Sequence, residues 1–359
     1  MAEPPTPTEA TLFVHQLRRL TPRVWVTPLI IAINVALFAF LVARGADVVS
    51  PSTEALLAQG ANYGPLTLAG AWWRLLTSTA LHIGIIHLAM NMFVLAQIGP
   101  LVERMVGNLP FLLLYLVTGF LASIASLAWD PQVVSAGASG AIFGCYGLFI
   151  GMLLRNQAAI PPSVRGQMFK GVATFLVLNV VVGVSMTQLD QAAHVGGLVA
   201  GVLAGLVVAL PLDPVGPRLR RALLVAVVGG ALGVGVLMTR PVPMDWHAPL
   251  DATVQLENRI NAQLEAATRQ SQAGELTDAQ FAVMLRTDIL PAWQAQRDVL
   301  AQTPDVPDRI QATFDKLVRY MDLRGKGLVL LAEAAETGDM SKLEAAKAAF
   351  KEAEAQAGP

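Results

Sequence analysis

The feature that most constrains this chain is a series of long apolar segments within its first 240 residues. A helix that crosses the hydrocarbon core of a bilayer needs about 20 mostly apolar residues, since no water is present there to satisfy an open backbone. Seven segments meet or approach this requirement: 24–43, 79–98, 109–128, 138–154, 169–187, 191–210 and 220–239. We therefore predict an all-α protein, a polytopic membrane bundle of helices.

Charged residues divide the 359-residue chain into two regions. Residues 1–240 contain 8 acidic and 13 basic side chains, whereas 241–359, half that length, contain 18 acidic and 12 basic ones. This uneven composition excludes a uniformly soluble protein, and the single cysteine, Cys145, excludes a disulfide-stapled scaffold. The chain also has no basic face of the kind that binds nucleic acid. A membrane domain followed by a soluble helical domain remains.

The predicted organisation has four parts. Residues 1–23 form a cytoplasmic segment that we expect to be disordered, and 24–210 form a core of six transmembrane helices. Residues 211–240 form a loop and a seventh transmembrane helix, and 241–359 form the soluble domain. In that domain, apolar periodicity predicts helices at about 249–272, 277–302, 306–336 and 341–356. Thr277 and Ser341 are the predicted N-caps of the second and fourth of these helices.

Basic residues in the short loops predict how the helices cross the membrane. Lysine and arginine concentrate in cytoplasmic loops, and they cluster here before the first segment and in alternate loops after it. We therefore expect a cytoplasmic N-terminus and, with seven spans, an extracytoplasmic C-terminal domain. If the glycine-rich seventh segment does not cross, that domain is cytoplasmic. The N-terminal residues lack the pattern of a removable signal peptide, which favours a multi-pass protein of a prokaryotic inner membrane.

Three polar clusters fall within the predicted spans, where polar groups are costly and mark functional sites. His82, His87 and Asn91 lie in the second segment, with His87 and Asn91 four residues apart on one helix face. Ser139 opens the fourth segment, and His194 lies near the start of the sixth. With the expected orientation, all three clusters lie at similar depth in the outer half of the bilayer.

These residue types suit nucleophilic catalysis. A serine hydroxyl needs a base to take its proton, and His194 is the available base for Ser139. Backbone N–H groups at the helix start near Ser139 could bind a developing oxyanion. The neighbouring glycines Gly137, Gly140 and Gly197 would let the two helices approach closely.

Simpler interpretations remain open for each cluster. A Gly-x-Ser-Gly sequence alone is weak evidence, and a single intramembrane histidine can make an interhelical hydrogen bond. The three histidines could bind a metal, but Asn91 is a poor ligand and no carboxylate lies nearby on those helices. We expect no metal and no cofactor. Asp190, four residues before His194, is expected to cap its helix.

Together with Trp73-Arg74, these motifs resemble the rhomboid family of intramembrane serine proteases, in order and spacing, across about residues 24–210. The resemblance implies a six-helix core with an irregular first loop at about 44–78. It also implies a Ser–His dyad without a third acid, which cleaves transmembrane segments of other membrane proteins near the outer membrane surface.

The same resemblance assigns roles to individual residues. It implies that Ser139 is the nucleophile and His194 the general base, and that His87, Asn91 and the Ser139 backbone N–H form the oxyanion hole. His82 would be a supporting polar residue. Phe143 stands where many members of the family have a tyrosine, and its ring can still hold the imidazole by stacking.

Two other functions compete with proteolysis. A non-proteolytic relative that binds membrane clients is disfavoured by the presence of Ser139 and His194. A transporter is disfavoured because matching halves of the chain show no repeated pair of interrupted spans. For the C-terminal domain, a solvated appendage or dimer contact is favoured over a module that docks substrates or partners.

Overall fold

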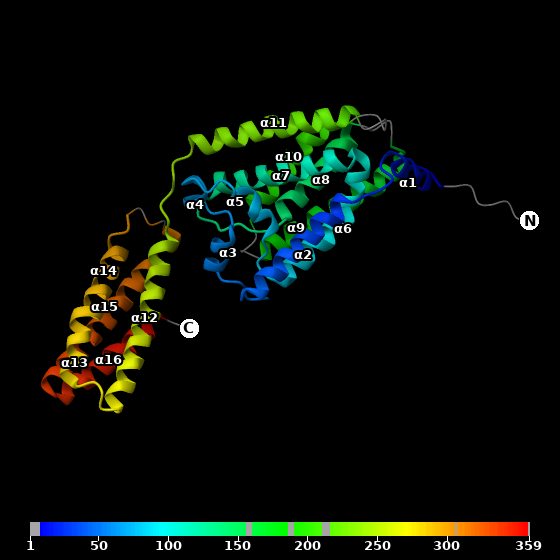
Figure 1. Ribbon diagram of the computed structural model, residues 1–359. Helices are drawn as coiled ribbons and strands as arrows, with labels where there is room; N and C mark the ends of the chain where they lie inside the picture. The colour runs from blue at the N-terminus through cyan, green and yellow to red at the C-terminus, as the bar shows by residue number, and fades with distance from the viewer. Residues whose placement is uncertain are drawn as a thin grey trace, which may run out of the picture. The chain divides into compact units, whose positions relative to one another are not determined.

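The computed structural model describes residues 8–155, 160–185, 190–209, 216–304, 306 and 308–357. The chain divides into two compact units, a membrane unit at Met1–Met244 and a C-terminal unit at Asp245–Pro359. Over the described residues, the regular elements are helices, joined by short loops with one isolated β-bridge (Figure 1). The predicted all-α class is confirmed.

The first helix, α1 (Glu9–Leu20), corrects the expected disorder of residues 1–23. The Thr8 side chain accepts a hydrogen bond from the Thr11 backbone N–H, which caps the helix. Phe13 and Leu17 lie one turn apart and are buried in the core of the membrane unit. An amphipathic face that buries two large apolar side chains offsets the entropy of ordering the segment. Residues 1–7 lie outside the described part of the chain.

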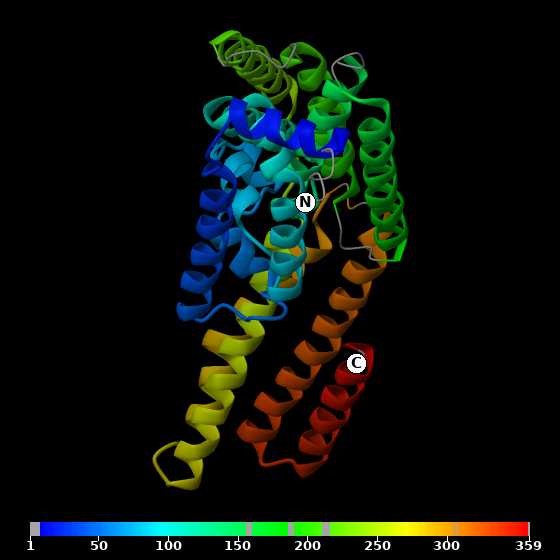
Figure 2. The ribbon, with the colours of Figure 1, turned by 90° about the vertical axis from the view of Figure 1, so that its right-hand side faces the viewer.

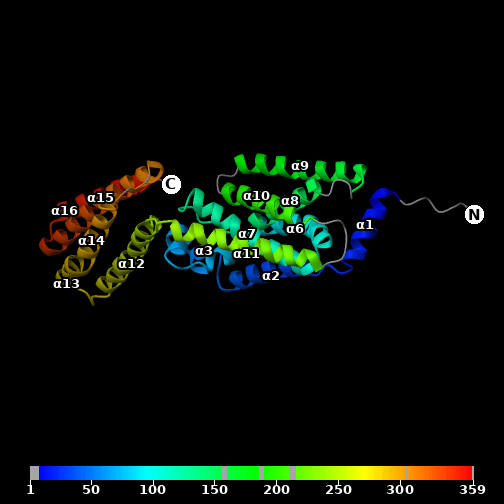
Figure 3. The same cartoon turned by 90° about the horizontal axis from the view of Figure 1, so that it is seen from above.

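The membrane unit contains seven long helices: α2 (Val26–Ala43), α6 (Ile85–Val106), α7 (Asn108–Trp129), α8 (Ser139–Arg155), α9 (Pro162–Ser185), α10 (Gln191–Val208) and α11 (Gly216–Thr239). Within the described residues, α2, α6, α7, α10 and α11 are long and apolar enough to cross a membrane, and α8 is a shorter apolar helix. Seen from two directions, α2 and α9 lie on opposite flanks of the bundle (Figures 2 and 3). The predicted spans 169–187 and 191–210 each end outside the described residues.

The second predicted span begins later than expected, at Ile85 rather than at residue 79. A short 3₁₀ turn, Ser78–Ala80, precedes it, and Gly84 adopts a left-handed φ of +114° that interrupts the helix. A Cβ on Gly84 would lie 2.1 Å from the Val49 carbonyl oxygen, so the first loop passes directly against this turn. His82 consequently lies in the turn before the helix and not on it.

The first loop is built from three short helices, α3 (Thr53–Gln59), α4 (Gly64–Leu68) and α5 (Arg74–Thr77). The Arg74 guanidinium is buried and joins two parts of this loop. It donates hydrogen bonds to the carbonyl oxygens of Leu57 and Ala61 at 2.7 and 3.1 Å. Burial of a guanidinium requires such partners.

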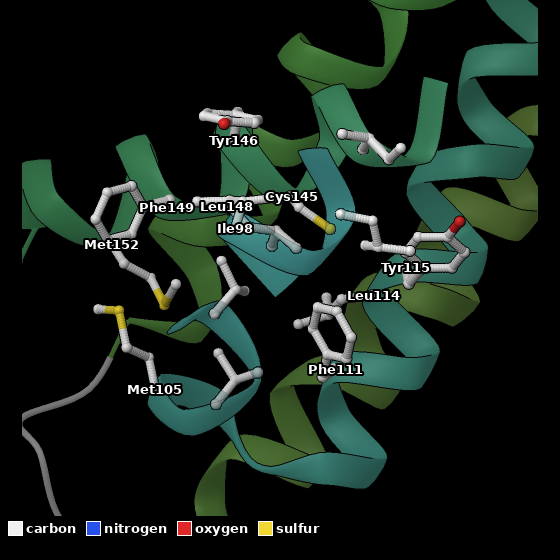
Figure 4. Close-up of a cluster of buried hydrophobic side chains, with 14 of the residues drawn as sticks. Ile98, Met105, Phe111, Leu114, Tyr115, Cys145, Tyr146, Leu148, Phe149 and Met152 are labelled. Carbon is white, nitrogen blue, oxygen red and sulfur yellow. The ribbon is translucent and has the colours of Figure 1, made fainter. Parts of the chain in front are cut away.

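The core of the membrane unit lies between α6, α7 and α8. Figure 4 shows side chains from all three helices converging there, with Ile98 and Met105 from α6, Phe111 and Leu114 from α7, and Cys145 from α8. Cys145 is fully buried in this cluster, and packing explains its position. Close packing of this kind makes the three helices a rigid frame for residues at their ends.

The C-terminal unit comprises α12 (His247–Gln272), α13 (Asp278–Met284), a π-helical turn (Leu285–Ile289), α14 (Leu290–Ala301), α15 (Asp308–Thr337) and α16 (Met340–Ala357). These helices follow the predicted ranges closely. Thr277 is the N-cap of α13, as predicted, and it forms a capping box with Gln280. The Ser341 cap is wrong, because α16 begins earlier and the Asp339 carboxylate accepts the Ser341 backbone N–H at 2.9 Å.

The centre of the C-terminal unit is Trp293, whose indole N–H donates to the Met321 carbonyl oxygen at 2.8 Å. Figure 2 shows α16 running beside α15 within this unit. Ile260 from α12 and Leu328 from α15 are buried in the same cluster. The unit therefore has an apolar core of its own.

Candidate active site

Ser139 and His194 meet at the ends of two closely packed helices. Ser139 is the first residue of α8, and His194 lies in the first turn of α10. The Ser139 Oγ and His194 Nε2 atoms are 2.8 Å apart, within hydrogen-bond distance. The His194 side chain is buried, with 5% of its surface exposed.

Glycines determine how closely α8 and α10 approach. A Cβ on Gly197 of α10 would lie 2.1 Å from the Gly140 carbonyl oxygen of α8. One turn further along, a Cβ on Gly201 would lie 2.2 Å from the Gly144 carbonyl oxygen. Only residues without a side chain permit these contacts. The predicted packing role of Gly140 and Gly197 is therefore seen in the backbone contact that brings Ser139 to His194.

The loop before Ser139 is shaped by Gly137. This glycine has a φ of +143°, which residues with a side chain rarely adopt, and its N–H donates to the Ser78 carbonyl oxygen at 2.9 Å. A Cβ at this position would come within 2.7 Å of the His87 ring. Gly137 thus allows the loop to pass directly over His87 on its way to Ser139.

The ring of Phe143 stacks on the imidazole of His194. The two ring centroids are 4.3 Å apart and the planes are inclined by 10°. Phe143 in turn contacts Phe175 of α9, at a centroid distance of 5.1 Å. The stacking predicted from the sequence is therefore present, and it fixes one face of the imidazole.

The other nitrogen of His194, Nδ1, is buried and has no hydrogen-bond partner among the described residues. Asp190 is the acid nearest to it in sequence, but its Oδ1 accepts the Ala193 backbone N–H at 2.9 Å. Asp190 therefore caps α10, as predicted. The arrangement is a pair of serine and histidine, and within the described part of the chain an aromatic ring, rather than a hydrogen-bonded carboxylate, contacts the imidazole.

The three polar residues of the second predicted span, His82, His87 and Asn91, occupy different positions. His87 lines the cavity beside Ser139 and His194. Asn91 is buried on α6, and its Nδ2 donates to the His87 carbonyl oxygen at 3.0 Å rather than pointing to Ser139. His82 is buried in the turn before α6, and its ring centroid lies 5.3 Å from that of His87. The structure thus places His87 in the lining of the cavity, whereas Asn91 and His82 are buried and are not part of that lining.

The cavity at the dyad measures about 30 Å³ and is lined by Ser139, His194, His87 and Gly140 together with residues of the loop before α8. A polar cavity of this size has room for a water molecule. Within the described residues, no group of three or more His, Cys, Asp or Glu side chains could hold a metal ion. Polar groups here can therefore activate a hydroxyl or hold a water molecule.

Two features that position the site leave no pattern in the sequence. The loop before Ser139 is paired with the first loop through a bridge between Asn62 and Ser135, in which each residue donates its N–H to the carbonyl of the other at 2.9 and 2.8 Å. The second feature is the hydrogen bond from the Gly137 N–H to the Ser78 carbonyl oxygen, which also joins two backbone groups. Contacts between backbone groups far apart in the chain leave no residue pattern by which they could be recognised.

Comparisons with known proteins agree with this geometry. Residues 69–211 match the family model of the Rhomboid domain. The chain is 35% identical to Rhomboid protease GluP of Bacillus subtilis (strain 168) over 277 residues, which are 77% of this chain and 48% of that protein.

Shorter matches extend to other relatives. The chain is 35% identical over 136 residues to Putative rhomboid protease YdcA of the same organism, covering 37% of this chain and 66% of that protein. It is 36% identical over 174 residues to RHOMBOID-like protein 7 of Arabidopsis thaliana, covering 47% of this chain and 53% of that protein. The chain spans about half the length of the first of these relatives.

Proposed function

Because this chain belongs to the rhomboid family, we propose that it is an intramembrane serine endopeptidase that cleaves transmembrane segments of other membrane proteins near the outer leaflet. The observation that carries the proposal is the 2.8 Å contact between the Ser139 Oγ and His194 Nε2 atoms. A hydroxyl becomes a useful nucleophile only when a positioned base can take its proton, and these two atoms are within that reach.

The reaction proceeds in two halves. His194 Nε2 takes the hydroxyl proton while Ser139 Oγ attacks the carbonyl carbon of the substrate. His194 then gives the proton to the amide nitrogen as the C–N bond breaks, which leaves an acyl group on Ser139. A water molecule, activated by His194 in the same way, attacks that ester, and the released acid and the free serine complete the cycle.

The negative charge of each tetrahedral intermediate needs hydrogen-bond donors. We assign this role to the Ser139 backbone N–H, which lies at the start of α8 where N–H groups have no partner within the helix, to the His87 side chain, and to Asn91. His87 lines the cavity and is the best supported side chain of the two. Asn91 would have to rotate its amide away from the His87 carbonyl, to which it donates in this structure.

The substrate must present an extended peptide bond to this site, since a helix hides its own carbonyls. The small cavity therefore favours a substrate segment that carries helix-breaking residues and small side chains at the cut. Such a segment loses little stability when it unwinds locally.

The side of the membrane on which the C-terminal unit lies is proposed from the position of the end of α11 near the loop that leads into α8. We propose that the N-terminus is cytoplasmic and that α11 is a seventh span, so that the C-terminal unit is extracytoplasmic at a prokaryotic inner membrane. This is supported by a hydrogen bond of 2.7 Å from the Gln132 side chain, in the loop before Ser139, to the carbonyl oxygen of Met244, which follows α11. The chain thus leaves the membrane unit on the side of the active-site loop.

Reconstitution tests the function. The purified protein in liposomes should cleave a model transmembrane substrate, whereas the Ser139→Ala and His194→Ala variants should lose at least about 10³-fold of the rate, as expected for loss of a nucleophile or its base. Cleavage by Ser139→Ala at the wild-type rate would exclude the proposed chemistry. The Gly230→Ala variant, a change in α11 where a Cβ would contact nothing within 4 Å, is the control for expression and insertion.

A further inference from the structure

The loop between α7 and α8, residues 130–138, is held in place by the first loop of the membrane unit. Besides the Asn62–Ser135 bridge, the Gly64 N–H donates to the Pro131 carbonyl oxygen at 2.8 Å. A Cβ on Gly64 would lie 2.4 Å from that oxygen, so the two loops are in direct backbone contact. Because this loop leads into Ser139, its position sets the position of the site.

One side chain in the loop reaches beyond the first loop. Gln132 accepts a hydrogen bond from the hydroxyl of buried Tyr63 at 3.2 Å, through its Oε1 atom. Its Nε2 atom donates to the Met244 carbonyl oxygen at 2.7 Å. Its backbone N–H donates to the Asp130 carboxylate at 2.9 Å, which fixes the turn that directs the side chain. Gln132 therefore joins three segments that are far apart in the sequence.

The position of Met244 gives this contact its meaning. Residues 240–244 form an extended linker after α11, and Met244 is the last residue of the membrane unit. The next residue, Asp245, belongs to the C-terminal unit. A displacement of that unit therefore acts on the backbone at Met244, whose carbonyl oxygen is bonded to Gln132.

We propose that Gln132 is a positioning residue that couples the linker of the C-terminal unit to the loop before Ser139, so that movement of this unit changes the turnover of the active site. The inference rests on the proposed function of Ser139. When the Gln132–Met244 bond is broken, the segment from Pro131 to Ser135 loses one of its attachments. The resulting displacement of the loop extends to Gly137, which lies against the His87 ring and leads into Ser139.

Two substitutions separate the two bonds of Gln132. Gln132→Leu removes both, whereas Gln132→Glu keeps an oxygen that accepts from Tyr63 and replaces the donor to Met244 by an acceptor. Both variants lose the bond to Met244, and each should lower kcat at least about threefold to tenfold, the range expected for loss of that one hydrogen bond, with KM within about twofold of wild type. Gln97→Leu, which removes an exposed glutamine of α6, is the matched control and should retain wild-type kcat.

The mobility of spin labels measures the coupling between the linker and the loop independently of cleavage activity. Because the only cysteine, Cys145, is buried, a label can be placed on Val242→Cys in the linker or on Val133→Cys in the loop, each in the full-length protein. Gln132→Leu and Gln132→Glu should each increase the mobility of both labels, and Gln97→Leu should leave both unchanged.

The outcomes distinguish this inference from the proposed function. If both labels become mobile and kcat falls at constant KM, the coupling is supported. If the Val242 label is unaffected by either variant, or if both labels become mobile while kcat stays at the wild-type value, the coupling is overturned. Wild-type cleavage by Ser139→Ala would instead overturn the proposed function, and the two label positions would still decide whether the loop and the linker move together.

Discussion

His194 is held by an aromatic ring on one face and by a serine at one nitrogen. The ring of Phe143 stacks on the imidazole with the two ring centroids 4.3 Å apart. Within the described residues, the Nδ1 atom of His194 has no hydrogen-bond partner. In a triad, a carboxylate at that nitrogen orients the base and stabilises its cation. Here the stacking of Phe143 holds the imidazole on one face, and the electron-rich face of that ring can stabilise the cation.

Replacement of Phe143 tests this role. Phe143→Leu should lower kcat about twofold to tenfold, because an aromatic pair contributes about 0.5–1.5 kcal/mol beyond its buried area. Phe143→Tyr keeps the ring and should retain activity close to wild type. Measurement of kcat in liposomes, with thermal unfolding as a check on folding, compares the two. Equal activity of the leucine and tyrosine variants would show that stacking does not position the base.

Replacement of Asn91 tests whether its side chain belongs to the oxyanion hole. In this structure its Nδ2 atom donates to the His87 carbonyl oxygen, and loss of that local bond by Asn91→Ala would change kcat little. If Asn91 turns to bind the oxyanion, the same variant should lower kcat about 10²-fold with little change in KM. We expect the larger effect. A loss below about threefold would remove Asn91 from the oxyanion hole.

At the scale of elements, the contact between α8 and α10 does most to bring the site together. Gly140, Gly144, Gly197 and Gly201 place carbonyl oxygens of one helix against Cα atoms of the other. Helices that approach this closely bring residues in their first turns within hydrogen-bond distance. The dyad is thus a consequence of helix packing as much as of side-chain choice.

A single methyl group should separate these helices. Gly197→Ala would place a Cβ 2.1 Å from the Gly140 carbonyl oxygen, and overpacking of this kind costs about 1–3 kcal/mol. We expect a lower unfolding midpoint in detergent and a loss of cleavage activity. Gly230→Ala on α11, where a Cβ would meet nothing within 4 Å, should leave both unchanged. Full activity and stability of Gly197→Ala would contradict the close approach.

The sequence was sufficient for the class of fold and for the pairing of Ser139 with His194, because apolar length and glycine spacing act locally. It was not sufficient for α1, whose order depends on burial of Phe13 and Leu17 against the membrane unit. The start of α6 was also missed, since the left-handed turn at Gly84 is fixed by contact with Val49 of the first loop. Positions set by contacts between distant segments cannot be inferred from local patterns.

At the scale of the whole molecule, the unequal distribution of charge corresponds to two units with separate cores. The charge-poor unit holds the dyad, and the charged unit is organised around Trp293. The path between them runs through α11, which packs on α7 where Gly233 faces Phe120. The side of the membrane on which the C-terminal unit lies therefore depends on whether α11 crosses.

Labelling of single cysteines tests this topology. With Cys145 replaced by alanine, a membrane-impermeant maleimide applied to intact cells should label Val242→Cys, which follows α11. Arg220→Cys, near the start of the same helix, should be labelled only after the cells are opened. Protection of both positions in intact cells would show that α11 does not cross and would place the C-terminal unit in the cytoplasm.

A covalent probe can show whether His194 activates the hydroxyl of Ser139. Incubation of the reconstituted protein with a fluorophosphonate, followed by mass-spectrometric mapping, should place one adduct on Ser139, and His194→Ala should abolish it. An adduct on another residue, or an adduct on Ser139 that forms equally fast without His194, would contradict the account.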